Sequence, residues 1–138
     1  MFKFKSAAAA AAIALFCAGA AFAGDDDPLF INLTSDDGHR VNMALAFGGK
    51  QMERGHPLTV FLNDRGVKAA AQANAEQFGD QQATLQKLLD EGATILVCPM
   101  CMKQYNVAQE DLLPGLEMGN PEHTGAQLFQ DDIVTLTW

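Results

Sequence analysis

The chain has 138 residues, of which 49% are hydrophobic, and its 17 Asp and Glu outnumber its nine Lys and Arg to give a formal net charge of -8. Nucleic acids and anionic lipid surfaces are disfavoured as partners, because both repel an acidic protein. The length leaves room for one compact domain around a single core.

The N-terminal segment has the pattern of a secretory signal peptide. Lys3 and Lys5 precede an apolar stretch over residues 7–22, and the motif Ala-Phe-Ala ends at Ala23, directly before an acidic run. A membrane anchor is the alternative, but the stretch is rich in alanine, short for a membrane span and without a positively charged stop-transfer flank. We therefore expect cleavage after Ala23.

Cleavage would leave a single domain over residues 24–138 and would remove Cys17 with the leader, residues 1–23. Without the two leader lysines, seven Lys and Arg face 17 Asp and Glu, so the mature charge becomes -10. The remaining cysteines, Cys98 and Cys101, would then lie in an oxidising exported space, which is most simply the periplasm. No association with a membrane is expected after cleavage.

Apolar runs and helical periodicities alternate along the mature chain. Gly38 and Gly55 bracket the first helical pattern, and Asp80 is expected as the N-cap of a second one, with Leu85, Leu88 and Leu89 buried. The pattern predicts strands at 28–34, 56–64, 93–97, 116–118 and 133–138, and helices at 39–54, 80–91, from about 99, and at 121–130. Residues 65–78 are compatible with either a helix or an irregular segment.

Strands that alternate with helices predict an α/β fold, with a mostly parallel sheet covered by helices on both faces. Five strands in about 115 residues fit a small flavodoxin-like three-layer α/β/α sandwich. Chemistry in such sheets lies at the carboxyl ends of the strands. Cys98 directly follows the third predicted strand and is therefore expected at that edge.

The cysteine pair stands at the expected start of a helix. Pro99 suits the first helical position, which makes Cys98 the N-cap and leaves the amides of Met100, Cys101 and Met102 free above it. These amides and the helix dipole favour a thiolate on Cys98, and the nearby Lys103 adds positive charge. Cys98 is therefore the candidate nucleophile, with Cys101, one turn further on, as its resolving thiol.

Three alternatives to reversible thiol chemistry remain for the pair. A structural disulfide would close too small a loop to stabilise the fold much, and two inert thiols would be unusual in an oxidising space. Cu(I) binding is the third alternative, with soft sulfur ligands from Cys98, Cys101 and Met102 and with Met100 nearby. A zinc site is weaker, because the sequence has no second Cys-x-x-Cys.

Other features add little chemistry. Asp64 and Arg65 follow the second predicted strand and could line the same edge as Cys98, although a solvated turn is the simpler explanation. The sequence has no glycine-rich phosphate loop between a strand and a helix, so we expect no nucleotide or flavin cofactor. Only 37 residues follow Cys101, too few for the remainder of a thioredoxin fold.

The segments FLNDRGV, ILVCPMCMKQYNV, EDLLPGLEMGNPE and DDIVTLTW resemble the DsrE/DsrF-like family of sulfur-relay proteins, over the range 28–138. The resemblance implies a flavodoxin-like fold, homotrimers or larger homo-oligomers and, as in the TusD-like and DsrE members, a cysteine after the third strand that carries sulfur as a persulfide. Cys98 falls on that cysteine. Sulfur donor and acceptor proteins, or small sulfur species, are the implied partners. The leader and Cys101 depart from the cytoplasmic members.

These features together give the hypothesis of an exported sulfur carrier or thiol redox protein. Cys98 would accept a sulfane sulfur and pass it to an acceptor thiol, while Cys101 could attack the persulfide and release sulfide. Two other classes stay open. One is a Cu(I)-binding module, and the other is an interaction subunit that does no catalysis.

Overall fold

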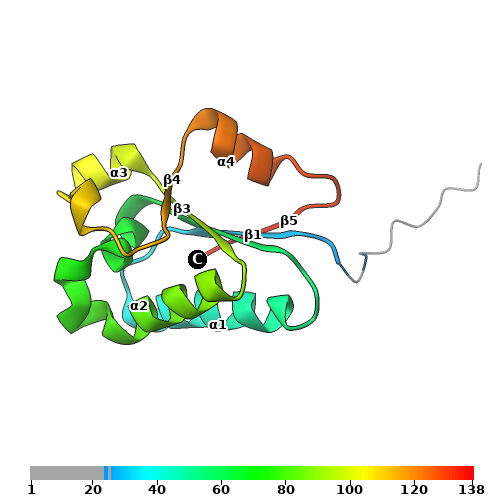
Figure 1. Ribbon diagram of the computed structural model, residues 1–138, viewed down its shortest axis with the longest axis horizontal. Coiled ribbons are helices and arrows are strands. Elements are labelled where there is room, and N and C mark those ends of the chain that lie inside the picture. The colour runs from blue at the N-terminus through cyan, green and yellow to red at the C-terminus, as the bar shows by residue number, and fades with distance from the viewer. Residues whose placement is uncertain (1–23, 25) are drawn as a thin grey trace, which may run out of the picture.

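The structure is a computed structural model that describes residue 24 and residues 26–138 (Figure 1). The expected leader, residues 1–23, lies outside the described residues. Within the described part of the chain, no helix combines the length and the apolar character needed to cross a membrane.

A single five-stranded sheet organises the molecule. All strand pairs are parallel, and the spatial order is β4-β3-β2-β1-β5. The strands are β1 Leu29–Leu33, β2 Leu58–Leu62, β3 Thr94–Val97, β4 Glu117–Met118 and β5 Val134–Thr137. The prediction of a mostly parallel sheet of five strands is therefore confirmed, and each strand falls within its predicted range.

Helices cover both faces of the sheet, as predicted. In Figure 1, α1 and α2 pack together on one face and α4 lies on the other. The α-helices are α1 Gly38–Met52, α2 Ala75–Asp90, α3 Pro99–Gln104 and α4 Pro121–Leu128, and short 3-10 helices occupy η1 Asp64–Ala70, η2 Gln72–Asn74 and η3 Gln109–Asp111. This arrangement is the three-layer α/β/α sandwich of a flavodoxin-like fold.

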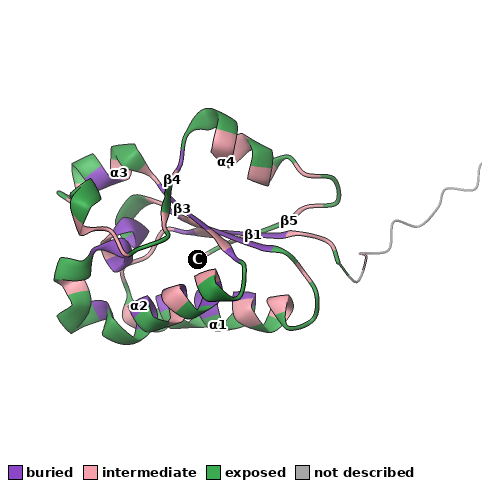
Figure 2. Cartoon of the chain, in the orientation of Figure 1, coloured by how far each residue is buried: buried purple, intermediate pink, exposed green. Residues whose placement is uncertain are grey.

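The hydrophobic core lies between the sheet and the α1/α2 layer. Alternate residues of each strand point to this side, because side chains alternate across a strand, and Leu29, Ile31 and Leu33 of β1 show the pattern. Helix α1 buries Val41 and Leu45 against them. Helix α4 buries none of its residues, and Figure 2 shows it only in the colours of exposed and intermediate residues. The two helical layers therefore contribute very unequally to stability.

The prediction that Asp80 caps the second helix was wrong. Helix α2 begins at Ala75 after the N-cap residue Asn74, and Asp80 lies inside it. A kink at Phe78, whose backbone is not helical and whose side chain is fully buried, separates the first turn of α2 from the part of the helix that the sequence predicted. Leu85 and Leu88 are buried as predicted, whereas Leu89 is only partly buried.

The direction of winding reverses at β4. From β1 to β4 each strand is placed beside the previous one, and the chain then crosses the other face through α4 to put β5 next to β1. Ligand sites in open parallel sheets form outside the carboxyl ends of strands where such a reversal occurs. A ligand site is therefore expected beside the residues that follow β3 and β4.

Candidate functional site

Cys98 is held at the junction of β3 and α3. Its backbone amide donates a 2.9 Å hydrogen bond to the Leu62 carbonyl oxygen and so continues the ladder from β3 to β2. Its Sγ accepts a 3.4 Å hydrogen bond from the Cys101 amide, and Pro99 occupies the first turn of α3. Cys98 is therefore the N-cap of this helix, as the sequence predicted.

The Cys98 side chain lines an open hollow of about 230 Å³ between the carboxyl ends of β3 and β4. Met100, the most exposed large hydrophobic side chain on its rim, is 81% exposed. Eight residues line the hollow: Phe61, Cys98, Pro99, Met100, Gly119, Asn120, Pro121 and Thr124. None of them is charged, so a sulfur species that reaches Cys98 does so through an uncharged, largely apolar surface.

The amides at the start of α3 are less free than expected. The Cys101 amide faces the Cys98 sulfur, but the Met102 amide donates to the Cys98 carbonyl oxygen at 2.9 Å within the helix. Lys103 is exposed near the end of α3 and is not among the residues of the hollow. One directed amide, rather than three, therefore contacts the candidate nucleophile.

Cys101 has a different environment. Both cysteines are free and partly buried, and the Cys101 Sγ–H donates a 3.4 Å hydrogen bond to Asn63 Oδ1. Burial and the hydrogen bond with Cys98 raise the pKa of the Cys101 thiol above its usual value. Cys101 therefore stays protonated at neutral pH, which is the behaviour of a slow second thiol.

Sequence reasoning missed two amide side chains in this site. Asn63 directly follows β2, and its Nδ2 donates a 3.0 Å hydrogen bond to Oδ1 of Asn32 in β1. The available signal was Asn32 itself, because a polar residue inside an otherwise apolar strand, LFINL, needs a hydrogen-bond partner.

Asp64 and Arg65 follow β2 at the same edge of the sheet, but they line a separate hollow. This second hollow is polar and measures about 360 Å³. Its lining consists of Thr34, Ser35, Asp36, Arg40, Asp64, Arg65 and Tyr105. The Tyr105 hydroxyl donates to the Asp64 carboxylate, which raises the pKa of Tyr105. Neither Asp64 nor Arg65 lines the hollow of Cys98.

The sulfur atoms proposed for copper are distributed between two environments. Met102 is only 3% exposed and belongs to the hydrophobic core, whereas Cys98 lines an open hollow. Among the described residues, His, Cys, Asp and Glu side chains do not gather in groups of three or more that would hold a metal ion. Cu(I) binding stays a prediction, and the burial of Met102 does not favour it.

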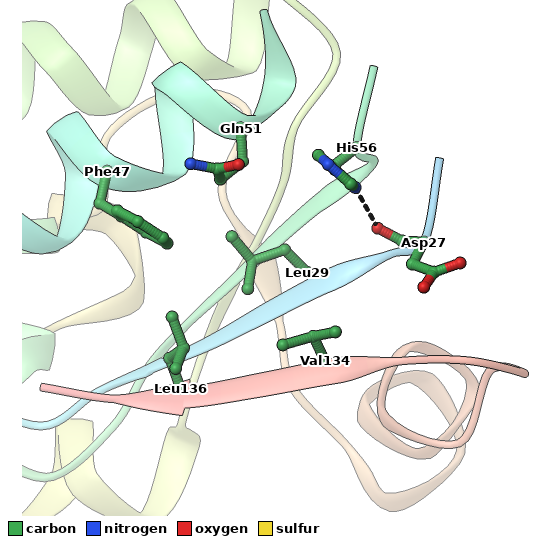
Figure 3. A pocket seen from close by; sticks show the side chains of 7 residues that line it. All are labelled: Asp27, Leu29, Phe47, Gln51, His56, Val134 and Leu136. Carbon is green, nitrogen blue, oxygen red and sulfur yellow. Dashed lines mark hydrogen bonds between the residues drawn. The ribbon is translucent and has the colours of Figure 1, made fainter. Parts of the chain in front are cut away.

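A third cavity, of about 140 Å³, lies at the opposite edge of the sheet (Figure 3). Leu29 and Val134, the first residues of β1 and β5, form its floor, and Phe47 of α1 closes one side. The ring of His56 bonds the Asp27 carbonyl oxygen at 2.8 Å, as the dashed line in Figure 3 shows. No thiol lines this cavity, so it does not take part in the chemistry of the cysteine pair.

The fold and the site define a small α/β protein with thiols at the carboxyl edge of a parallel sheet, one of them beside an open hollow. Comparison with known families makes this more specific. The chain belongs to the DsrE/DsrF-like family, whose sequence profile matches residues 3–136. A search of the curated proteins found no match.

Solved structures confirm the fold. A protein of unknown function from Methanobacterium thermoautotrophicum is 14% identical, with a TM-score of 0.68 over 82% of this chain and 100% of that one. The ychN protein from E. coli is 15% identical, with a TM-score of 0.57 over 82% and 99% of the two chains. A conserved protein of unknown function from Bacteroides thetaiotaomicron is 20% identical, with a TM-score of 0.59 over 81% and 95%.

Proposed function

We propose that this protein is an exported sulfur carrier in which Cys98 holds a sulfane sulfur as a persulfide. The observation that carries the proposal is the placement of the Cys98 sulfur in an open hollow at the reversal point of the sheet, with the Cys101 amide directed at it. Membership of the DsrE/DsrF-like family supports sulfur-relay or thiol redox chemistry.

The transfer needs no external oxidant. The Cys98 thiolate attacks the sulfane sulfur of a persulfide or polysulfide donor, the donor's sulfur–sulfur bond breaks, and the donor leaves as a thiolate. The new sulfur–sulfur bond is that of the Cys98 persulfide, whose terminal sulfur an acceptor thiolate then takes by the same exchange. The Cys101 amide stabilises the sulfur of Cys98 as an anion both before uptake and after release.

The second thiol decides whether the protein works as a carrier or as a reductase. If Cys101 attacks the persulfide, sulfide is released and a Cys98–Cys101 disulfide forms, which a reductant must reopen. The raised pKa of Cys101 makes this attack slow at neutral pH. The hydrogen bond that the Cys101 thiol donates to Asn63 acts in the same direction, so a carrier is favoured over a reductase.

The setting of this activity is also proposed. The leader pattern in residues 1–23 supports export to the periplasm, and the family resemblance supports assembly into homotrimers or larger homo-oligomers. Donor and acceptor are proteins with reactive cysteines or small sulfur species. The uncharged lining of the hollow favours uncharged groups next to the transferred sulfur.

Mass spectrometry of the exported protein after exposure to polysulfide tests the proposal. We expect one added sulfur atom on the wild type, the same adduct on Cys101→Ser, and none on Cys98→Ser. Each single serine variant serves as the matched control for the other, because both remove one partly buried thiol from the same helix start. An adduct that persists on Cys98→Ser, or an unmodified Cys101→Ser protein, would contradict the role given to Cys98.

A further inference from the structure

Two asparagine side chains connect the central strands to the second thiol. The Asn63 backbone amide donates to the Leu33 carbonyl oxygen at 3.0 Å, and its Nδ2 donates to Asn32 Oδ1 at 3.0 Å. These two bonds fix the backbone and the side-chain orientation of Asn63, so that its Oδ1 is turned toward α3. There it accepts the 3.4 Å hydrogen bond from the Cys101 thiol.

The orientation of the Asn63 amide matters chemically. An amide oxygen accepts only from a protonated thiol, whereas an amide NH₂ would donate to a thiolate and favour ionisation. Because the NH₂ group of Asn63 is directed at Oδ1 of Asn32, the amide oxygen is the end of this side chain that is turned toward Cys101.

We propose that Asn63 is a positioning residue that holds Cys101 as a neutral thiol and thereby protects a persulfide on Cys98 from being resolved. This inference rests on the proposed function and adds a control of the persulfide's lifetime. Asn32 acts through Asn63 by fixing which end of its amide faces the sulfur.

The reaction that Asn63 restrains is balanced without another reactant. Ionised Cys101 attacks the inner sulfur of the Cys98 persulfide, a disulfide bond forms, and the outer sulfur leaves with its electron pair as hydrosulfide. At lower pH the hydrosulfide takes up one proton, equivalent to the proton that Cys101 lost, and is released as hydrogen sulfide. The attacking group must be a thiolate, so its rate follows the ionised fraction of Cys101.

Within the part of the chain that the structure describes, the titratable groups that act on the charge of Cys101 are Cys98, the N-cap of its own helix, and Asp64, on η1. Cys98 and the Asp64 carboxylate oppose a negative charge on Cys101, while the Asp64 backbone amide favours it. The Asp64 carboxylate is also bound by the Tyr105 hydroxyl, which fixes its place. The hydrogen bond to the Asn63 oxygen therefore disfavours ionisation of Cys101, as burial does, whereas the Asp64 backbone amide favours it.

Two substitutions with opposite expected effects test the inference. Asn63→Ala removes the acceptor and admits water, so the midpoint of Cys101 alkylation should move down by about half to one pH unit, the size expected for one hydrogen bond. Asn63→Asp keeps an acceptor and adds a negative charge, so the midpoint should move up. Asn74→Ala, which also loses one side-chain hydrogen bond but lies on η2, is the matched control and should leave it unchanged.

Alkylation by iodoacetamide over a pH series, followed by fragment-ion mass spectrometry, resolves the two cysteines. A second measurement follows sulfide release from protein loaded with polysulfide, which should be about three- to tenfold faster at neutral pH in Asn63→Ala and slower in Asn63→Asp. If Asn63 had a merely structural role, the alkylation midpoint and the rate of sulfide release would change in the same direction in both Asn63 variants. That result would overturn the inference.

The two proposals fail in different ways. If wild-type Cys98 takes up no sulfur, the proposed function fails, while the alkylation midpoints still decide whether Asn63 controls Cys101. If Cys98 takes up sulfur and both Asn63 variants match the wild type in midpoint and in sulfide release, the control by Asn63 is refuted and the carrier function stands.

Discussion

Replacement of Gly66 by alanine should destabilise the fold strongly. Gly66 is buried in η1, and a Cβ added there would lie 2.2 Å from the Leu33 carbonyl oxygen and 3.0 Å from the Leu33 carbonyl carbon. Both atoms belong to the backbone of a central strand and do not move aside easily. The same oxygen accepts the hydrogen bond from the Asn63 amide, so the added methyl group also competes with that bond.

The cost can be estimated from these two effects. Overpacking a buried site costs about 1–3 kcal/mol, and a weakened backbone hydrogen bond adds about 1 kcal/mol. The expected loss is thus about 2–4 kcal/mol, or roughly 8–16 °C in Tm for a domain of this size. This is a large part of the total stability of about 5–15 kcal/mol typical of native proteins.

Urea and thermal unfolding followed by circular dichroism measure the loss. Gly79→Ala is the matched control, because Gly79 lies in α2 with no atom within 4 Å of the added Cβ. It should be neutral or stabilise the protein by up to about 1 kcal/mol, since alanine is the better helix former. A Gly66→Ala protein within about 0.5 kcal/mol of the wild type would refute the reasoning, because surface-like substitutions have effects of that size.

Two predictions concern pH. The raised pKa of Cys101 means that the folded state binds this proton more tightly, so its contribution to stability is complete below the unfolded pKa, about 8.5, and is lost as pH rises through the folded value. Denaturant titrations between pH 8 and 10 should therefore show that the free energy of unfolding falls less steeply with pH in Cys101→Ala than in the wild type. Parallel curves of this free energy against pH would contradict the prediction. The hydrogen bond from Lys68 lowers the pKa of Asp36, so that pair stabilises above the unfolded value of 3.8 and its contribution is lost as pH falls through the folded value. Lys68→Met should cost less than about 1 kcal/mol at pH 7, and the difference from the wild type should vanish in unfolding measurements below pH 3.

Local patterns predicted the fold well where burial dominates. The apolar runs around Val60 and Ile95 identified strands β2 and β3, whose side chains are covered in the folded protein. The second strand nevertheless ends earlier than expected, because Asn63 and Asp64 leave the sheet and Asp64 takes a left-handed backbone conformation, with φ 47°. That turn is set by the contacts of η1 with the sheet, which composition alone does not reveal.

The site was only partly predictable for a related reason. Cys98 was found because a strand end, a proline and a helix start are adjacent in sequence. Asn32 and Asn63 lie 31 residues apart, and Cys101, the hydrogen-bond partner of Asn63, is a further 38 residues along the chain. Hydrogen bonds between neighbouring strands depend on strand order and register, and these become known only with the fold.

The parallel sheet explains why two thiols three residues apart differ so much. Cys98 directly follows β3 and lines the open, uncharged hollow between the ends of β3 and β4, where the winding of the chain reverses. Cys101, one turn along α3, faces the end of β2 instead, where Asn63 and η1 cover it. A disulfide oxidoreductase needs two thiols that both exchange readily, whereas a sulfur carrier needs one reactive thiol and a second thiol that reacts slowly. The arrangement of strands thus fits the proposed storage of sulfur on Cys98, and in that proposal its release depends on how firmly Asn63, at the end of β2, holds the Cys101 proton.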